Sequence, residues 1–260
     1  MYTFQEIMDF YDGNETVYNE IKKNLPNLVP FVGAGLTAFA YCGWGEALAK
    51  ISQRMKNDFE AKKRVEQQIA SGEYLKAAQT IEDELTPETV AHEMEKLFTS
   101  DKLTEKMKEL PKQAIYLLPK LFNGLVITTN FDQSIETVYG QEIPMFHMPV
   151  AHPGHSEWLS KRLYDTERGV FKLHGTVEGG VVEYGNIVFT ARQYRRNYGL
   201  FSQLRRGLTE CFKTRAMLFL GCSLAKDRTM SVLDKVTRKS EYNYNYAIVN
   251  CTAAEREARV

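Results

Sequence analysis

The segment from Leu28 to Thr37 reads LVPFVGAGLT, a short apolar run that stops at a Gly-Ala-Gly turn. A short run with Val and Phe, bounded by glycines, is typical of a strand that is buried on both faces. Because glycine has no Cβ, the chain can turn sharply at Gly33 and Gly35, and its amides can approach a phosphate closely. A phosphate-binding turn and a tight strand-to-helix turn without a ligand explain this stretch equally well. The longer dinucleotide fingerprint is not met, since Ala38 stands where its third glycine belongs.

Four later apolar runs predict further buried strands, at residues 124–132, 170–175, 216–223 and 244–250. Buried strands that alternate with helical segments indicate an α/β fold: a Rossmann-like, open and mostly parallel sheet with helices on both faces. In such sheets ligands bind beyond the carboxyl ends of the strands. Glycine or polar residues follow four of the strands, so we expect a site at one edge of the sheet, formed by residues 33–35, 129–132, 172–175 and 221–223.

The segments between the strands predict most of the helices. We expect a leading helix over residues 4–24, broken near Gly13, and a helix that begins at Trp44 and packs its apolar side on the sheet. Thr86 and Pro87 are the residue types of an N-cap and a first helical residue. The remaining expected elements are helices at 60–69, 77–85, 133–139, 191–197, 200–213, 227–239 and 253–259, a β-hairpin over 181–190, and an irregular segment over 144–154.

The whole chain, residues 1–260, is expected to form one domain. Residues 1–27 are its N-terminal helical lead, and the charged stretch 57–112, which lacks a convincing strand, is a helical insertion within it. Because a charged helix begins near residue 253 and the sequence stops at Val260, we expect the domain to be part of a longer chain.

The composition excludes several classes of function. Lys plus Arg and Asp plus Glu both total 33, so the formal net charge is zero and a domain-wide nucleic-acid-binding surface is not expected. With no membrane-spanning run and no signal-peptide pattern, the sequence predicts a cytoplasmic protein. No Cys-x-x-Cys pair occurs, which fits a reducing compartment and speaks against a four-cysteine zinc site. The four cysteines are Cys42, Cys211, Cys222 and Cys251.

Four short motifs stand at the predicted strand ends. They are Gly-Ala-Gly-x-Thr at 33–37, Thr-Thr-Asn-Phe-Asp at 128–132, Lys-Leu-His-Gly at 172–175 and Gly-x-Ser at 221–223. Their order, from about residue 28 to about residue 250, resembles the sirtuin family, whose Rossmann-like domain binds NAD. Thr37, Thr129 and Phe131 stand where sirtuins carry serine, glutamine and isoleucine.

Two larger departures refine this resemblance. Protein-deacylating sirtuins hold a structural zinc with two Cys-x-x-Cys pairs, which are absent here, and their Gly-Ile-Pro-Asp-Phe-Arg stretch is replaced by residues 38–44. Without the zinc module that forms one wall of the acyl-lysine groove, the chain is more similar to the zinc-lacking, sirtuin-like domains of bacterial antiphage defence proteins. The resemblance implies that NAD is the substrate, that it is hydrolysed to ADP-ribose and nicotinamide, and that no zinc is bound.

The resemblance also implies roles for the site residues. Asn130 would bind the ribose hydroxyls and position a water molecule, and Asp132 would accept a hydrogen bond from the nicotinamide carboxamide. His174 would be the general base, since an imidazole titrates near neutral pH. A helix cap is the alternative role for the first two residues, and a structural histidine for the third. The binding set comprises Gly33, Ala34, Gly35 and Thr37 for the pyrophosphate, Thr129, and Gly221, Ser223 and Asp227 for the adenosine half, with a helix cap as the alternative for Ser223.

A histidine-containing loop and an arginine cluster suggest other functions, which the sequence does not favour. The loop has a single carboxylate, Glu157, and no cysteine beside its histidines, so a metal site is not expected. The arginines lack an aromatic-interleaved motif, so we expect solvated helix faces or a contact between protomers rather than nucleic-acid binding. The loop histidines are His147, His152 and His155, and the arginines are Arg192, Arg195, Arg196, Arg205 and Arg206.

The sequence thus predicts an NAD glycohydrolase, the effector domain of a bacterial antiphage (abortive infection) system. Its expected partners are NAD and either further copies of itself or a sensor domain or subunit, without direct contact with nucleic acid or a membrane. Two alternatives stay open: an NAD-dependent protein deacylase, and a non-catalytic sensor of NAD or ADP-ribose. The absent zinc module argues against the first, and the presence of both Asn130 and His174 argues against the second. Because unregulated NAD hydrolysis is toxic, we expect the resting domain to be held inactive.

Overall fold

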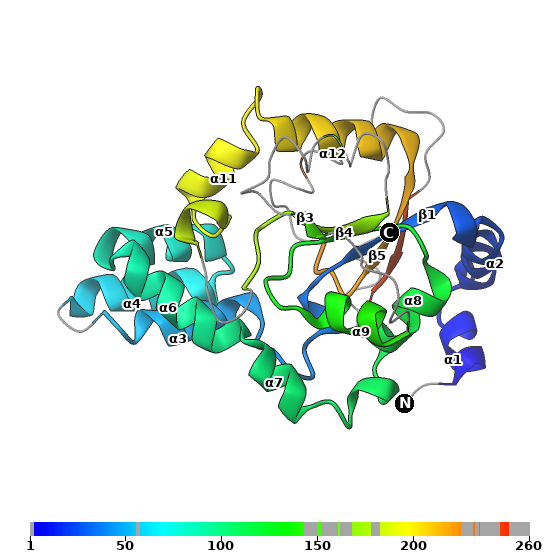
Figure 1. Cartoon of the computed structure of the whole chain (residues 1–260), viewed down its shortest axis with the longest axis horizontal. Helices are drawn as coiled ribbons and strands as arrows, with labels where there is room; N and C mark the ends of the chain where they lie inside the picture. Colours follow the sequence, from blue (N-terminus) through cyan, green and yellow to red (C-terminus); the bar gives the residue numbers. More distant parts are fainter. Residues whose placement is uncertain are drawn as a thin grey trace.

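Six parallel strands form one sheet in the order β3-β4-β2-β1-β5-β6 in the computed structural model of this protein (Figure 1). The structure describes residues 3–55, 58–142, 150–151, 161, 168–177, 183–224, 231, 234 and 245–249. The strands are β1 (Leu28–Val32), β2 (Leu125–Thr128), β3 (Val150–Ala151), β4 (Gly169–Lys172), β5 (Ala216–Leu220) and β6 (Tyr246–Ile248). A parallel sheet between helices confirms the predicted α/β, Rossmann-like fold.

Strand β1 lies at the centre of the sheet, between β2 and β5. Phe31 is paired with Ile127 on β2 and with Phe219 on β5. All five residues of β1 are buried, as its uninterrupted apolar run predicts. From β1 the chain builds the sheet on the β2 side first and returns at β5 on the other side, so the strand order reverses between β1 and β5. In open α/β sheets, ligands bind at the carboxyl ends of the strands that flank such a reversal.

The helices agree closely with the predicted ones over most of the chain. The leading helix is broken near Gly13, α3 begins at Trp44, and Thr86 caps α6 with Pro87 in its first turn. The α-helices are α1 (Phe4–Asp9), α2 (Asn14–Asn24), α3 (Trp44–Ser52), α4 (Phe59–Ala70), α5 (Tyr74–Glu84), α6 (Pro87–Phe98), α7 (Ser100–Glu105), α8 (Leu118–Leu121), α9 (Ser134–Glu142), α11 (Ala191–Asn197) and α12 (Gln203–Thr214). The short 3-10 turns are η1 (Leu25–Asn27), η2 (Ala34–Leu36), η3 (Leu110–Lys112), η4 (Ala114–Leu117) and η6 (Tyr184–Asn186).

The strands bury alternate side chains on the two faces of the sheet, because successive residues of a strand point to opposite sides. On one face, Phe31 and Ile127 belong to an apolar cluster that includes Leu208 of α12. On the other face, Val32 and Val126 belong to a second cluster that includes buried residues of α3 and α9. Figure 1 shows α12 on one side of the sheet and α8 and α9 on the other. The sheet is therefore the middle layer of three.

Helices α4, α5 and α6 form a helical lobe beside the sheet (Figure 1), within the stretch predicted as a helical insertion. Asp58 caps α4 by accepting a hydrogen bond from the Ala61 amide at 2.8 Å. Val65, Ile81 and Met94 of the three helices are buried in the same apolar cluster as the sheet residues that face α3. The helical lobe therefore shares its core with the sheet.

The predicted β-hairpin over 181–190 is wrong for the residues that the structure describes there, 183–190. They form the turn η6 and an extended segment that leads into α11. The Gln193 side chain explains the difference. Its Oε1 accepts from the amides of Phe189 and Thr190 at 2.8 and 2.9 Å, and its Nε2 donates to the Tyr184 carbonyl at 3.2 Å. These backbone groups therefore need no cross-strand partner.

The structure also contains a strand that the sequence did not predict. Val150 of β3 pairs with Val170 of β4, inside the segment predicted as irregular. The predicted helices at 227–239 and 253–259 lie outside the described residues, apart from the helical residues 231 and 234. Among the described helices, none combines the length and apolar character that a membrane crossing requires.

Candidate active site

Three buried polar side chains meet where β1 and β2 end. Asn130 Nδ2 donates to Thr37 Oγ1 at 3.3 Å, and Thr37 Oγ1 lies 3.2 Å from Asp132 Oδ2. Their exposed fractions are 6%, 1% and 4% for Asn130, Thr37 and Asp132. The Thr37 hydroxyl accepts from the amide, and its single proton is shared between the Asp132 carboxylate and the Ala34 carbonyl, which lies 3.3 Å away. The structure thus brings together three predicted site residues from two distant segments of the chain.

The turn after β2 is fixed by hydrogen bonds from its own side chains. Thr128 Oγ1 donates to the Val32 carbonyl at 2.8 Å and accepts from the Asn130 amide at 3.0 Å. Asp132 Oδ1 accepts from the Ser134 amide at 3.0 Å, at the start of α9. The alternative role of Asp132, a helix cap, therefore coexists with its contact to Thr37. Each carboxylate oxygen of Asp132 has a separate partner, which orients the group.

A buried lysine on β4 ties this turn to α9. Lys172 is 0% exposed, and its Nζ donates to the backbone carbonyl of Asp132 and to Glu136 Oε1, the latter at 2.9 Å. A charge so deeply buried requires a close opposite charge, which Glu136 provides. Lys172 was predicted only as part of a motif, and Glu136 was not among the predicted site residues. The available signal was a lysine within an otherwise apolar strand, since lysine is almost never fully buried unless paired.

His174 follows β4 and is held on both sides by tyrosines, Tyr194 of α11 and Tyr198 at the C-cap of that helix. Its Nε2 lies 3.1 Å from Tyr198 Oη, and its Nδ1 lies 3.3 Å from Tyr194 Oη. Both tyrosine rings meet the imidazole edge to face, and the two tyrosines stack with centroids 5.5 Å apart. Neither tyrosine was among the predicted site residues, and Tyr198 lies one residue beyond the predicted helix 191–197, so the pair could not be placed on one face of it.

Burial changes the proton affinity of His174. The ring is 4% exposed, and desolvation lowers the pKa of His174 from its ordinary value of 6.5 to about 3. The imidazole is therefore neutral at physiological pH, with one ring nitrogen protonated and the other an acceptor. The expectation that this histidine titrates near neutral pH does not hold for the protein in this state.

The glycines at the end of β1 are explained by backbone packing. The Gly33 amide donates to the Leu220 carbonyl, and the Gly35 amide donates to the Gly221 carbonyl, both at 2.9 Å. A Cβ added at Gly33 or Gly35 would lie 2.6 or 2.8 Å from the Gly221 carbonyl oxygen. Gly221 has φ +64°, and a Cβ there would lie 2.5 Å from the Leu36 amide nitrogen. The loops after β1 and β5 therefore meet at a distance that only glycine permits.

No helix follows the Gly-Ala-Gly turn directly, in agreement with the predicted helix start at Trp44. The chain forms the turn η2 over Ala34–Leu36, and α3 begins only at Trp44. The helix dipole of α3 is thus not located at the glycine turn. Pyrophosphate binding by Gly33, Ala34 and Gly35 stays a prediction. To bind a phosphate, the Gly33 and Gly35 amides would have to give up their hydrogen bonds to the Leu220 and Gly221 carbonyls.

Two of the remaining predicted site residues, Thr129 and Ser223, are described by the structure and follow β2 and β5. Thr129 is partly buried between the Thr128 and Asn130 positions described above, and Ser223 is exposed after β5. Asp227 lies outside the described residues, as do the loop histidines 147, 152 and 155. Within the described part of the chain, no group of three His, Cys, Asp or Glu side chains is placed to hold a metal ion. Trp44 packs in the core as expected, stacked on Phe131 with centroids 6.2 Å apart.

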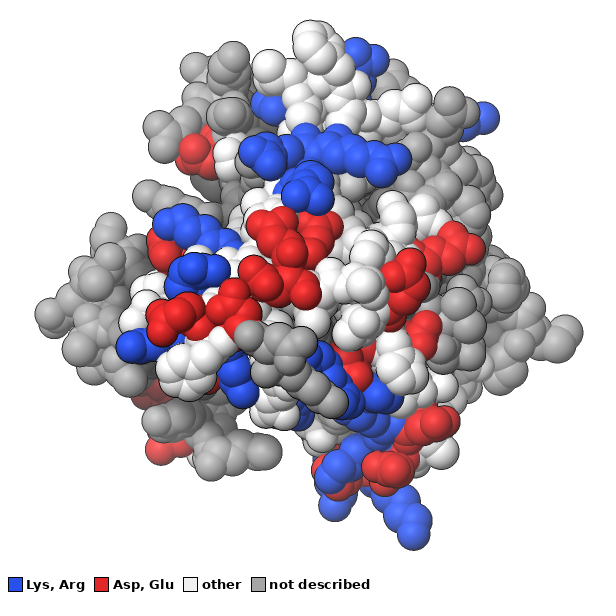
Figure 2. Space-filling view, turned by 90° about the vertical axis from the view of Figure 1, so that its left-hand side faces the viewer, with Lys and Arg blue, Asp and Glu red and all other residues white. Residues whose placement is uncertain are grey.

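The arginine cluster has acidic neighbours. Arg192 Nη2 lies 3.3 Å from Asp83 Oδ1, and its Nη1 lies 3.6 Å from Glu82 Oε2, both on α5. Figure 2, which views the side of the molecule that carries the helical lobe, shows acidic side chains beside basic ones on this face. A surface with both signs of charge does not suit a polyanion.

The fold and the polar edge of its sheet define a Rossmann-like α/β protein. A family model described as a SIR2-like domain matches residues 124–260, just over half of the chain, so the chain belongs to the SIR2-like family. The matched range contains Asn130, Asp132, His174 and Gly221, and it begins after the Gly-Ala-Gly turn. Members of this family are NAD-dependent enzymes, which assigns an NAD-related activity in general terms. A search of curated proteins finds no match.

Gly221→Ala tests the contact between the two loops. The added methyl group meets the Leu36 backbone at 2.5 Å, and the left-handed φ of +64° is unfavourable for alanine. We expect a loss of more than about 1 kcal/mol in the free energy of unfolding by urea. Gly124→Ala is the control, because a Cβ at Gly124 meets nothing within 4 Å, and it should change stability by less than about 0.5 kcal/mol. Equal effects of the two substitutions would contradict this account of Gly221.

The buried His174 predicts a defined pH dependence of stability. Its folded-state pKa is depressed, so the unfolded chain binds more protons between pH 6.5 and about 3. The stabilisation is therefore present above pH 6.5 and is lost as the pH falls through that window. Between pH 7 and pH 5, the fall in unfolding free energy should be about 2 kcal/mol smaller in His174→Gln than in the parent protein. His92→Gln, at an exposed histidine, is the control, and identical pH profiles for all three proteins would refute the prediction.

Lys172→Met and Glu136→Leu test the buried ion pair. Each single substitution leaves a charge without its partner and should cost about 3 kcal/mol in unfolding free energy. The double variant, which removes both charges, should cost clearly less than the sum of the two single changes. Strictly additive losses would show that the two charges do not interact.

Proposed function

We propose that this protein hydrolyses the bond between nicotinamide and ribose in NAD, giving ADP-ribose and nicotinamide. The observation that carries the proposal is the joining of Asn130, Asp132 and Thr37 in one buried hydrogen-bonded cluster at the carboxyl edge of a parallel sheet. His174 follows β4, the strand that pairs with β2, and belongs to the same edge. Membership of the SIR2-like family supports NAD as the substrate.

The reaction needs little acid catalysis. The glycosidic C–N bond breaks with its electron pair passing to nicotinamide, which leaves as a neutral molecule, while C1 of the ribose gains oxocarbenium-like charge, as in glycoside cleavage. Water then adds to that carbon and loses one proton. The protein must therefore hold the ribose, fix the carboxamide of nicotinamide, and provide an acceptor for that proton.

In the proposed mechanism, Asn130 holds the ribose hydroxyls and positions the water. Asp132 accepts a hydrogen bond from the nicotinamide carboxamide through one oxygen. Its other oxygen still accepts from the Ser134 amide, and this bond orients the carboxylate. His174 is neutral and so has an acceptor nitrogen for the proton, but the burial that keeps it neutral also weakens it as a base, so the step requires water or substrate to reach the ring. In this structure a tyrosine hydroxyl lies against each ring nitrogen of His174. One of these two hydroxyls must therefore be replaced by water or by a ribose hydroxyl when the substrate binds.

The wider proposal follows the resemblance of the motifs. Thr129, Gly221, Ser223 and Asp227 complete the binding set, and the domain acts in the cytoplasm as the effector of a bacterial antiphage system. It works as a homo-oligomer or with a sensor domain or subunit, without binding nucleic acid or a membrane directly. No zinc is required, because the chain has no Cys-x-x-Cys pair.

NAD turnover by the purified protein, without any peptide, tests the proposal. Asn130→Ala and His174→Ala should each lower the production of ADP-ribose and nicotinamide at least about a hundredfold, because each removes a group that acts in the bond-breaking or water-addition step. Asn24→Ala and His92→Ala are matched controls on α2 and α6 and should keep the parent rate.

The other outcomes separate the rival functions. Release of nicotinamide only when an acylated peptide is added would identify a deacylase. Binding of NAD without turnover, in every oligomeric state of the protein that can be isolated, would identify a sensor. Unchanged turnover in both Asn130→Ala and His174→Ala would refute the assignment of the site.

A further inference from the structure

Two tyrosines face His174: Tyr194 of helix α11, and Tyr198 at the C-cap of the same helix. Tyr194 and Tyr198 are 4% and 3% exposed, lie one turn apart, and are stacked at an interplanar angle of 17°. Their hydroxyl groups lie 3.3 and 3.1 Å from the two nitrogens of the His174 ring. The imidazole is therefore held at both of its polar atoms by two residues that are one helical turn apart.

This arrangement suits a neutral histidine in one tautomeric form. A neutral imidazole has one N–H donor and one acceptor nitrogen, whereas a tyrosine hydroxyl can donate or accept. One tyrosine hence accepts from the ring N–H, and the other donates to the bare nitrogen. Exchange of the ring proton between the two nitrogens would require both hydroxyls to reverse their hydrogen bonds at the same time.

We propose that Tyr194 and Tyr198 are positioning residues, which fix the tautomer and the ring plane of His174 and so decide which nitrogen carries the proton and which can accept one. They act through His174 and are not themselves assigned a step in the chemistry. The proposal deepens the proposed function, because it concerns the residue assigned there as the base.

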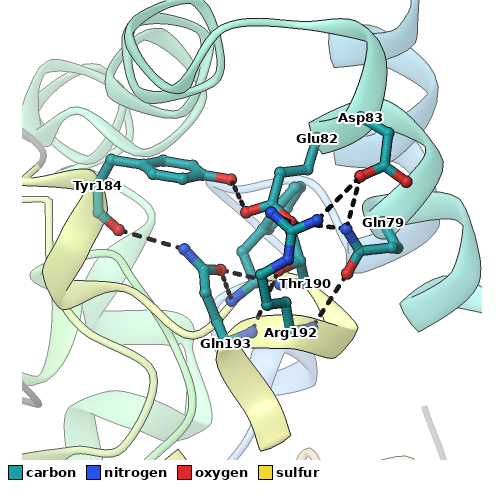
Figure 3. Close-up of polar contacts among 8 residues, drawn as sticks. Gln79, Glu82, Asp83, Tyr184, Thr190, Arg192 and Gln193 are labelled. Carbon is teal, nitrogen blue, oxygen red and sulfur yellow. Dashed lines mark hydrogen bonds and ion pairs between the residues drawn. The ribbon is translucent and has the colours of Figure 1, made fainter. Parts of the chain in front are cut away.

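The helical lobe fixes α11 in place for this purpose. The Arg192 amide donates to Gln79 Oε1 at 3.0 Å, and the Arg192 guanidinium lies between Glu82 and Asp83 (Figure 3). Gln79 Nε2 in turn donates to Glu82 Oε2 and Asp83 Oδ1 at 2.7 and 3.0 Å. The first turn of α11 is thus hydrogen-bonded to the side chains of α5.

A second set of contacts joins the turn η6, which precedes α11, to the side chains of α5. Tyr184 Oη donates to Glu82 Oε1 at 2.9 Å, and the Tyr184 carbonyl accepts from Gln193 Nε2 (Figure 3). Gln193 and Thr190 form a capping box at the start of α11. Arg192 and Gln193, which make these contacts, directly precede Tyr194. The position of α5 therefore sets the position of the two tyrosines.

Nuclear magnetic resonance of protein labelled with ¹⁵N-histidine tests the proposal without any substrate. The chain has five histidines, and His174→Gln assigns the signals of His174. In the parent protein we expect two well-separated ¹⁵N signals, one from a protonated and one from a bare nitrogen, that stay constant from pH 7 to pH 5. Two signals of similar shift, the sign of interchanging tautomers, would overturn the proposal before any tyrosine is changed.

Tyr194→Phe and Tyr198→Phe keep the aromatic ring and remove one hydroxyl each. Each variant should move the His174 signals, and in at least one of them the two signals should approach each other as the tautomers begin to interchange. Tyr18→Phe on α2 is the matched control and should move neither signal. Unchanged His174 signals in both α11 variants would overturn the proposal.

The anchoring by α5 and the kinetic effect have separate readouts. Gln79→Ala removes the acceptor of the Arg192 amide and should broaden or shift the His174 signals, whereas Gln5→Ala on α1 should not.

If NAD hydrolysis is confirmed, the two tyrosine variants should lower kcat about tenfold to a hundredfold with little change in KM. Failure of NAD hydrolysis would refute the proposed function and leave the resonance result intact. Unaltered kcat in variants whose signals move would refute the positioning role.

Discussion

The close approach of two backbone turns, at Gly33–Gly35 and at Gly221, is the contact on which the arrangement of the site depends. Two amide-to-carbonyl hydrogen bonds join the turns, and none of the three glycines has room for a side chain. The contact continues the pairing of β1 with β5 past the ends of both strands. It also directs the chain into the turn η2, which delivers Thr37 to Asn130 and Asp132. Backbone packing at the centre of the sheet thus sets the position of a side-chain cluster.

Two titratable groups, Lys172 on β4 and His174 just after it, are buried among different kinds of partner. Lys172 is held beside Glu136 and the Asp132 carbonyl, in surroundings that suit a cation. His174, two residues later, is surrounded by tyrosine rings and hydroxyls, and desolvation keeps it neutral. The difference comes from the partners, because burial alone disfavours the charged form of both groups. One segment therefore supplies a fixed charge to the structure and an uncharged acceptor to the candidate site.

The sequence predicts the sheet well, because β1, β2 and β5 are uninterrupted apolar runs whose burial leaves few other interpretations. The sequence also predicts that Thr37, Asn130 and Asp132 lie close together, because the carboxyl ends of parallel strands meet at one edge of the sheet. Local patterns failed where a side chain replaced a backbone partner, as Gln193 does before α11. The environment of His174 could not be predicted from local sequence patterns. It depends on how α11 docks against α5, a contact between segments 113 residues apart in the chain.

The position of β1 between two distant partners has a consequence for how the chain folds. Contacts of its carboxyl end reach residues 96 positions away on the β2 side and 191 positions away on the β5 side. Loops of this length close slowly, so the centre of the sheet forms late and only after most of the chain has been synthesised. Until β5 arrives, β1 presents an unpaired apolar edge of the kind that promotes aggregation. We therefore expect the central strand of the finished sheet to be prone to aggregation until β5 has been synthesised.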